Sequence, residues 1–162
     1  MEFLGKYAAE IIALCALLFT AWNVYTQRKH NILSVTPHLT RFVTSDQNGE
    51  VGVAKLELMN NGLGPAFIEK FQIYLNNEFC EYDAALDFVT KGMDCKWHRT
   101  RLGAGYAMKA GEAKDLFSVA FPCKNNEELA ATREKFNALD VAIEYKCAYG
   151  KIKKFDTFDK QD

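Results

Sequence analysis

The stretch that decides the fold is "EVGVAKLELMNNGLGPAFIEKFQIYL", residues 50–75. Apolar and polar residues alternate in its first part, so that Ala54, Leu56 and Leu58 fall on one face of an extended chain. The second part alternates in the same way, and we expect it to place a second set of apolar side chains inward: Phe71, Ile73 and Leu75. A period of two is typical of half-buried β-strands. The stretch therefore predicts two strands joined by a glycine-rich turn.

The turn "NNGLGPA" also has the closely spaced glycines of a phosphate-binding loop, but its other positions do not fit that chemistry. A P-loop ends in Gly-Lys-Ser/Thr, whereas Gly64 is followed by Pro65 and Ala66. A dinucleotide fingerprint needs a third glycine where this chain has Phe67, and "GAGYAM" fails the same test at Met108. We expect a structural turn, in which Asn61 and Gly62 adopt positive φ and Pro65 fixes the exit.

The remaining chain adds further extended segments. Residues 32–45, "ILSVTPHLTRFVTS", read as an extended run, and Asn48-Gly49 predicts a hairpin turn. "NNE", residues 76–78, predicts another turn, and Tyr149-Gly150 predicts a hairpin near the C-terminus. Two short strands are expected around Ala110-Gly111, whereas "MDCKWHRTRLGAG", residues 93–105, has no regular pattern.

Two short helices are expected among these strands. Residues 83–92 form the first, with Asp83 as the cap and Gly92 at the end. Residues 125–140 form the second, capped by Asn125 with Glu128 at the spacing of a capping box. Strands outnumber helices and do not alternate with them, which disfavours a parallel sheet. The sequence predicts a mainly β domain: an antiparallel immunoglobulin-like β-sandwich of about seven strands with two short helices.

The N-terminal segment "YAAEIIALCALLFTAWNVY", Tyr7–Tyr25, carries a single charge, Glu10. As a helix it would be about 28 Å long, close to the hydrocarbon thickness of a bilayer. Tyr7 lies at one end and Trp22 and Tyr25 at the other, as interfacial aromatics do. A cleaved signal peptide and a soluble core helix are the alternatives. We expect a membrane anchor and its basic flank in residues 1–30, followed by a β-sandwich domain in residues 31–162.

Flanking charge predicts the orientation of this anchor. Arg28 and Lys29 follow the apolar segment, against Lys6 before it. Because basic residues favour the cytoplasmic side, the β domain is expected in the cytoplasm rather than the periplasm. The four domain cysteines leave this open, because they could form two disulfides outside or pack as thiols inside: Cys80, Cys95, Cys123 and Cys147.

One segment, "DCKWHRTR", has residues that could carry chemistry. Cys95 and His98 form a C-x-x-H pair, but a zinc site normally takes four ligands and the chain has no second pair. A Cys-His nucleophile lacks a recognisable oxyanion motif. Trp97, Arg99 and Arg101 instead suggest, with Cys95 and His98, a candidate interaction loop. No catalytic, cofactor-binding or metal-binding residue is assigned, and a net charge of −1 disfavours a nucleic-acid partner.

Three landmarks, in order along the chain, resemble a family. They are "HNILSVTPHL" after the apolar helix, "NNGLGPA" and "YKCAYG". Together they are similar to uncharacterised bacterial single-pass membrane proteins with an HN-x-LSV-x-P entry and an N-x-G-x-GPA turn. The resemblance implies a β domain tethered to the bacterial inner membrane, and it implies no reaction.

The expected function is a membrane-anchored, non-catalytic interaction or sensing module. Its expected partners are the lipid bilayer and either another protein or a second copy bound through the membrane helix. Thr20, Asn23 and Glu10 motivate an alternative, an accessory subunit of a larger membrane complex. A hydrolase-type enzyme using Cys95 and His98 is the third hypothesis.

Overall fold

The computed structural model describes residues 2–158, with side chains from Tyr7 onward, so the side chain of Lys6 lies outside the described part. The chain divides into two compact units, Met1–Val35 and Thr36–Asp162. The first unit is a single helix, α1 (Glu2–Ser34). It continues past the predicted start of an extended run at Ile32, which was therefore placed too early. Pro37 follows three residues after the end of α1, and a proline disfavours helical conformation in the residue that precedes it.

By length and composition, α1 is able to cross a membrane over Tyr7–Ser34, a property that anchors share with signal sequences. None of the most apolar part of this segment is buried. The 33 residues of α1 correspond to about 50 Å. The helix is thus about 20 Å longer than a bilayer's hydrocarbon core.

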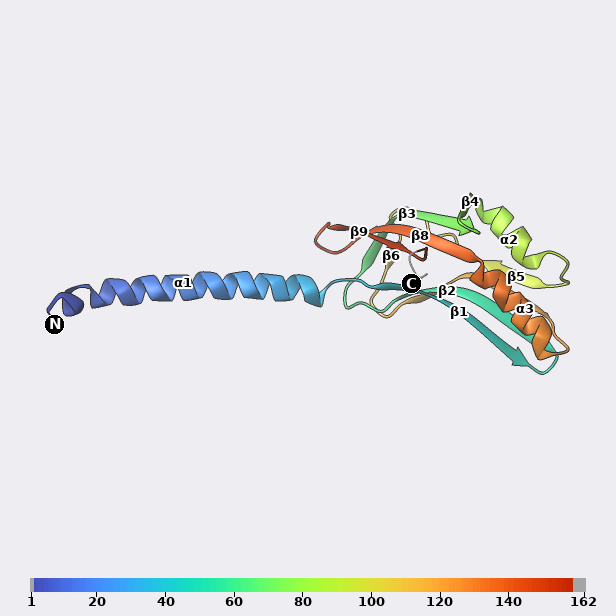
Figure 1. The fold of residues 1–162 in the computed structure, drawn as a ribbon, viewed down its shortest axis with the longest axis horizontal. Coiled ribbons are helices and arrows are strands. Elements are labelled where there is room, and N and C mark those ends of the chain that lie inside the picture. Colours follow the sequence, from blue (N-terminus) through green and yellow to red (C-terminus); the bar gives the residue numbers. More distant parts are fainter. Residues whose placement is uncertain (1, 159–162) are drawn as a thin grey trace. The chain divides into compact units, whose positions relative to one another are not determined.

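The second unit consists of two antiparallel sheets (Figure 1). The first sheet has the order β1-β2-β7-β5 and contains β1 (Leu39–Asn48), β2 (Val51–Asn60), β7 (Ala113–Pro122) and β5 (Lys96–Arg99). The second has the order β4-β3-β8-β9 and contains β4 (Glu78–Cys80), β3 (Ala66–Leu75), β8 (Leu139–Lys146) and β9 (Ile152–Asp156), while β6 (Ala107–Met108) also pairs with β3. The mainly β class is confirmed. The described residues contain nine strands, against about seven predicted, and three of the nine have four residues or fewer.

One buried core joins the two sheets, and the alternation read from the sequence is largely confirmed in it. Ala54, Leu56 and Leu58 of β2 are fully buried. In β3 the inward face changes parity, because Ala66 and Ile68 are buried before an irregularity at residues 68–70 and Ile73 after it. A β-bulge shifts the pleat by one residue, which is why a strict period of two does not extend along the whole strand.

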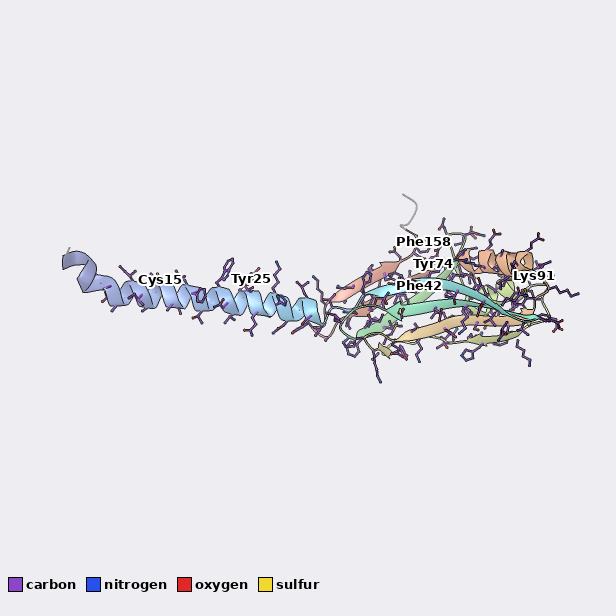
Figure 2. The ribbon with its side chains drawn as sticks, turned by 90° about the horizontal axis from the view of Figure 1, so that it is seen from below. Cys15, Tyr25, Phe42, Tyr74, Lys91 and Phe158 are labelled. Atoms are coloured by element: carbon purple, nitrogen blue, oxygen red, sulfur yellow. The ribbon has the colours of Figure 1, made fainter. Side chains whose placement is uncertain are left out.

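The predicted turns occur with small shifts. Gly49 has φ +62° in the β1–β2 turn, and Asn76 and Asn77 have φ of +52° and +68° between β3 and β4. The C-terminal hairpin joins β8 to β9 at the predicted place. The strands around Ala110-Gly111 also occur, as β6 and β7, but they belong to different sheets. On the outer face of β3, Phe158 packs edge-on against Tyr74, with ring centroids 4.6 Å apart (Figure 2).

Two short helices accompany the sheets, as predicted. α3 (Asn126–Asn137) begins with the expected Asn125 cap, whose side chain accepts from the Glu128 N–H at 2.9 Å. The Glu128 carboxylate accepts from the Lys124 N–H at 2.9 Å, one residue before the N–H that a capping box uses. α2 (Tyr82–Thr90) begins one residue earlier than predicted. Its N-cap position is Glu81, which makes no side-chain cap, so Asp83 lies in the first turn and is not the cap.

The motif "NNGLGPA" forms a close junction with the segment that enters the β unit. Asn60 is fully buried, and its Oδ1 accepts from the backbone N–H groups of His38 and Gly62, both at 3.1 Å. Its Nδ2 donates to three carbonyls, those of Gly64 at 2.8 Å, Lys109 at 3.1 Å and Met108 at 3.3 Å. The side chain therefore connects three backbone segments, which makes it a structural hub.

Gly62 has a different role from the one predicted. Neither it nor Asn61 has a positive φ. A Cβ on Gly62 would instead lie 2.3 Å from the His38 nitrogen and 2.5 Å from the Pro37 Cα. Glycine is needed here because two backbones approach each other, and this approach brings the first and second landmarks of the resemblance into contact.

Candidate functional site

The candidate interaction loop forms a strand at the edge of the first sheet. β5 pairs with β7 on one side only, with Trp97 opposite Val119 and Arg99 opposite Phe117. Residues 93–105 are thus not wholly irregular as predicted. All four residues of β5 are exposed, and Trp97 is 52% exposed. An edge strand leaves backbone N–H and C=O groups on its outer side available for pairing.

The C-x-x-H pair does not come together on this strand. Side chains alternate along an extended chain, so a separation of three places Cys95 and His98 on opposite faces. Cys95 is partly buried against the core, and burial, followed by the nearby Asp94, raises the pKa of its thiol. His98 is exposed, with Nε2 3.5 Å from the Thr100 hydroxyl. A catalytic cysteine needs a depressed pKa and an adjacent base, so this arrangement does not favour a Cys-His nucleophile.

Trp97, Arg99 and Arg101 have the parity of Cys95, opposite to His98, and form a row of aromatic and cationic groups. The Arg99 guanidinium lies 5.7 Å from the Trp97 ring centroid and forms an ion pair with Asp83 of α2. Arg101 lies 5.6 Å from the ring centroid of Tyr82. This row, which we call the aromatic–cation edge (Trp97, Arg99 and Arg101), connects β5 to α2 and presents a half-exposed tryptophan.

Tyr82 supports this edge from inside the core. Its hydroxyl donates to the carbonyls of Thr100 and Leu116, the latter at 3.1 Å, and its ring packs against Phe117 at 4.7 Å. Burial raises the pKa of Tyr82 well above its usual value, so the hydroxyl stays protonated and acts as a donor. No local sequence pattern indicates this role, since the two carbonyls lie 18 and 34 residues away.

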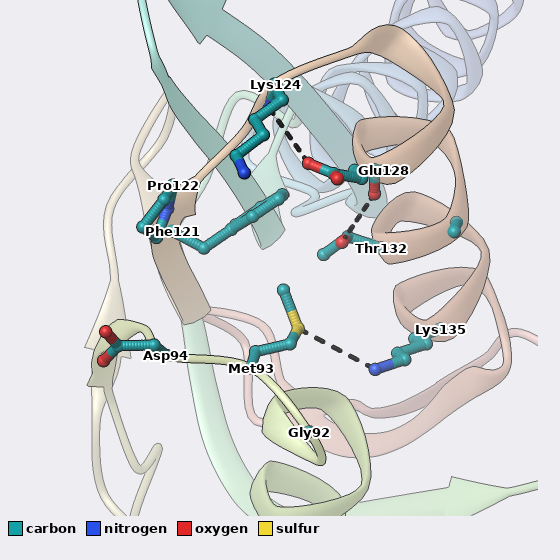
Figure 3. A pocket seen from close by; sticks show the side chains of 10 residues that line it. Gly92, Met93, Asp94, Phe121, Pro122, Lys124, Glu128, Thr132 and Lys135 are labelled. Atoms are coloured by element: carbon teal, nitrogen blue, oxygen red, sulfur yellow. Dashed lines mark hydrogen bonds between the residues drawn. The ribbon is translucent and has the colours of Figure 1, made fainter.

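A cavity of about 410 Å³ lies between the α2–β5 loop, the end of β7 and α3 (Figure 3). Its wall combines apolar groups, Met93 and Phe121, with the charged residues Asp94, Lys124 and Glu128. A second opening of about 320 Å³ shares Asp94 and Phe121 with it and continues along β5 to Lys96.

The polar groups of this cavity wall are largely engaged within the protein. Lys135 donates to the carbonyls of Lys91 at 3.2 Å and Val89 at 3.3 Å, at the C-terminal end of α2 (Figure 3 shows the ammonium facing Met93). The Thr132 hydroxyl donates to the Glu128 carbonyl at 2.9 Å. The Lys135 contacts tie α2 to α3, whereas the Thr132 bond lies within α3.

The cysteines of the β unit are free thiols, with Cys123 and Cys147 buried. Within the described residues, no group of three or more His, Cys, Asp or Glu side chains is arranged to hold a metal ion. On α1 the predicted anchor residues Tyr7, Glu10, Trp22 and Tyr25 are exposed, as are Arg28 and Lys29. No protein-family model matches the chain, and no curated protein matches it significantly.

Proposed function

We propose that the chain is a single-pass, membrane-anchored module whose β domain binds another protein through the aromatic–cation edge. The observation that carries the proposal is the combination of a long exposed apolar helix with a β unit that exposes Trp97 on an unpaired sheet edge. Tryptophan and arginine are the residues most enriched at the energetic centres of interfaces. An edge strand adds backbone groups that an extended partner segment can pair with.

We further propose that the β unit is an immunoglobulin-like sandwich. The order β1-β2-β7-β5 corresponds to strands A-B-E-D of that fold, and β4-β3-β8-β9 corresponds to C′-C-F-G. A single core shared by both sheets supports the same reading. By analogy, domains of this type commonly act in recognition.

The β domain is proposed to lie on the cytoplasmic side of a bacterial inner membrane. Arg28 and Lys29 on α1 support this side by the positive-inside rule. The buried free thiols of Cys123 and Cys147 fit a reducing compartment. The non-catalytic part of the proposal is supported by the opposite faces of Cys95 and His98. The alternative, an accessory subunit of a larger membrane complex, is favoured by Asn23 in the apolar helix.

Site-directed photo-crosslinking in native membranes tests the binding surface. A photoreactive amino acid at position 97 is expected to yield one discrete adduct. The same group at Phe42, which is 42% exposed on the opposite edge strand β1, serves as the matched control. Equal adducts at both positions, or none at position 97, would contradict the proposed surface.

Thiol labelling of intact cells tests the side of the membrane. The Lys91→Cys variant places a thiol at an exposed position of the β unit. A membrane-impermeant maleimide is expected to label it only after permeabilisation. Labelling in intact cells would place the domain on the periplasmic side.

A further inference from the structure

Four chain segments meet at the end of the β unit where the chain enters from α1. The β2–β3 loop lies against the entering segment, because the Leu63 N–H donates to the Thr36 carbonyl at 3.2 Å. The β6–β7 turn is held beside them by Asn60, whose amide donates to the Lys109 carbonyl at 3.1 Å. The β8–β9 turn lies at the same end, since the last residue of β8 pairs with the start of β3 (Figure 1). We call this surface the entry end, and it comprises residues 36–38, 61–65, 109–112 and 146–153.

The entry end exposes several large apolar side chains. Leu63 is 74% exposed, more than any other large apolar side chain described in the β unit. Tyr149 in the β8–β9 turn and Ile152 at the start of β9 are 56% and 59% exposed. None of the three belongs to the buried core or packs against it. A single exposed apolar residue is ordinary on a protein surface, but three at one end indicate a surface that makes a contact.

The same end carries cations that the protein does not neutralise. Lys109, Lys151 and Lys153 form no ion pair in the part of the chain that the structure describes. The acidic residues in or beside the entry end already have cationic partners at 3.0 to 3.3 Å: Glu69 with Lys146, Glu112 with Lys114, and Glu144 with Lys154. The entry end therefore has unneutralised positive charge next to its exposed apolar groups.

The length of the tether keeps the entry end close to the membrane surface. Beyond the apolar segment, which ends at Tyr25, α1 continues over residues 26–34, about 14 Å. The headgroup layer occupies about 5–8 Å of this length, so Ser34 lies within about 10 Å of the headgroups, and a helix tilt shortens the distance. Only Val35 separates Ser34 from Thr36, so the covalent chain spans at most about 7 Å between them. The entry end is therefore within reach of the lipid surface.

We propose that the entry end docks on the anionic lipid headgroups of the same bilayer that holds α1, an inference that rests on the proposed membrane anchor. The free lysines are complementary to anionic headgroups, and apolar burial adds to this attraction when Leu63 enters the interface. Tyr149 suits the headgroup level, because its ring is apolar and its hydroxyl is polar. Lysines alone would be explained as a guard of the β9 edge against aggregation, but a guard does not account for the apolar side chains beside them.

Fluorescence quenching of the full-length chain in liposomes tests the docking. Leu63→Cys and Tyr149→Cys are labelled separately with the same fluorophore, in a background in which the three native cysteines that are not buried are alanine. Lys91→Cys, at the opposite end of the β unit (Figure 2), is the matched control. In vesicles of phosphatidylglycerol and phosphatidylcholine, lipids with spin-labelled headgroups should quench the first two labels several-fold more than the control. Equal quenching at all three positions, or none at Leu63→Cys and Tyr149→Cys, would overturn the docking.

Charge variants test whether anionic lipid is the partner. Combining Lys109→Gln, Lys151→Gln and Lys153→Gln should lower the ratio of docked to undocked chains about tenfold or more, because each lysine near an anionic surface adds attraction. High salt and vesicles of phosphatidylcholine alone should have the same effect. The matched control removes three exposed lysines toward the opposite end and should leave quenching unchanged: Lys91→Gln, Lys96→Gln and Lys124→Gln. Equal effects of the two triple variants, or full quenching in phosphatidylcholine alone, would overturn the assignment to anionic lipid.

Failure of the docking can be distinguished from failure of the proposed function. Alkaline extraction should leave the chain in the membrane fraction, and its release would overturn the anchor and the docking together. A chain that stays in the membrane but shows equal quenching at both ends of the β unit would overturn only the docking. A photoreactive amino acid at position 149 should label lipid in native membranes, and a discrete protein adduct would assign the entry end to a protein partner instead.

Discussion

The substitution Asn60→Ala should destabilise the β unit more than any other change of similar size. The side chain makes five hydrogen bonds, two of them fully buried, to the carbonyls of Gly64 and Met108. Leaving a buried group without a partner costs about 1–3 kcal/mol. The other three bonds are partly buried, and each contributes about 0.5–1 kcal/mol because water can replace the partner. We expect a total loss of about 4 kcal/mol, against about 5–15 kcal/mol for a whole domain.

Urea unfolding of the full-length chain in mild detergent, followed by the β-sheet circular dichroism signal, measures this loss. Asn61→Ala is the matched control, because Asn61 is exposed and its side chain makes one hydrogen bond, to the Thr40 hydroxyl at 3.1 Å. That variant should lose less than about 1 kcal/mol. If the two variants unfold at the same urea concentration with the same slope, Asn60 is not the hub inferred from its contacts.

The variant Asn60→Asp sharpens the same test through its pH dependence. The new carboxylate would face three carbonyl oxygens, which disfavours its charged form and raises its folded pKa above the unfolded value of about 3.9. The protonated form keeps one donor. Its stability is therefore highest below the unfolded pKa and falls as pH rises through the folded pKa. A variant that becomes more stable between pH 4 and 7, relative to the native chain, would refute this reasoning.

Four further outcomes are expected. Gly62→Ala should lower the free energy of unfolding by about 2 kcal/mol or more in the same urea assay, because the new Cβ would lie 2.3 Å from a backbone atom. The control Gly103→Ala, whose Cβ would have nothing within 4 Å, should change it by less than about 0.5 kcal/mol. Similar losses in the two variants would contradict the close approach at Gly62. Tyr82→Phe should cost about 0.5–1.5 kcal/mol, because the hydroxyl bonds to the Thr100 and Leu116 carbonyls are lost while the ring contacts remain and Leu116 keeps the Thr100 N–H at 3.0 Å; an unchanged midpoint would assign the role to the ring alone. The pKa of Glu112 is lowered by the Tyr106 hydroxyl at 2.6 Å and by the Lys109 N–H at 2.7 Å. The carboxylate therefore stabilises the folded state above its unfolded pKa, near 4.5, and this stabilisation is lost as pH falls from there through the lower folded pKa. Glu112→Gln should flatten the decline of stability in acid, and acid curves that run parallel for the two proteins would contradict this. The Cys95 thiol, whose pKa burial raises, should react with maleimide at pH 7 about tenfold more slowly than the thiol of Lys91→Cys; equal rates would show an accessible thiol.

Local patterns predicted much of the fold, and the exceptions have physical causes. Alternation identified the buried face of β2, and Asn125 with Glu128 identified the start of α3, because both depend on neighbouring residues. The bulge in β3 could not be predicted, since the pairing of β8 across the sheet produces it. The strand β5 itself was missed for a similar reason. Four exposed residues show no apolar alternation, and their pairing with β7 defines the strand.

Two roles that depend on backbone atoms far away in the sequence could not be predicted from local patterns. The sequence identified "NNGLGPA" as a turn but not the need for glycine at position 62, because the backbone it meets belongs to residues 36–38. Tyr82 is similar, since the carbonyls it binds come from two other segments. Both roles involve main-chain atoms, which have the same chemistry whatever the residue. A residue pattern therefore contains little information about them.

The C-x-x-H pair illustrates how a spacing acquires meaning only from the element that carries it. On a helix, residues three apart lie on one face, and Cys95 and His98 could have shared a ligand or a proton. On β5 the same spacing separates them, one toward the core and one toward solvent. Once the period of the segment is known, the most enzyme-like spacing in the sequence therefore no longer brings two reactive groups together.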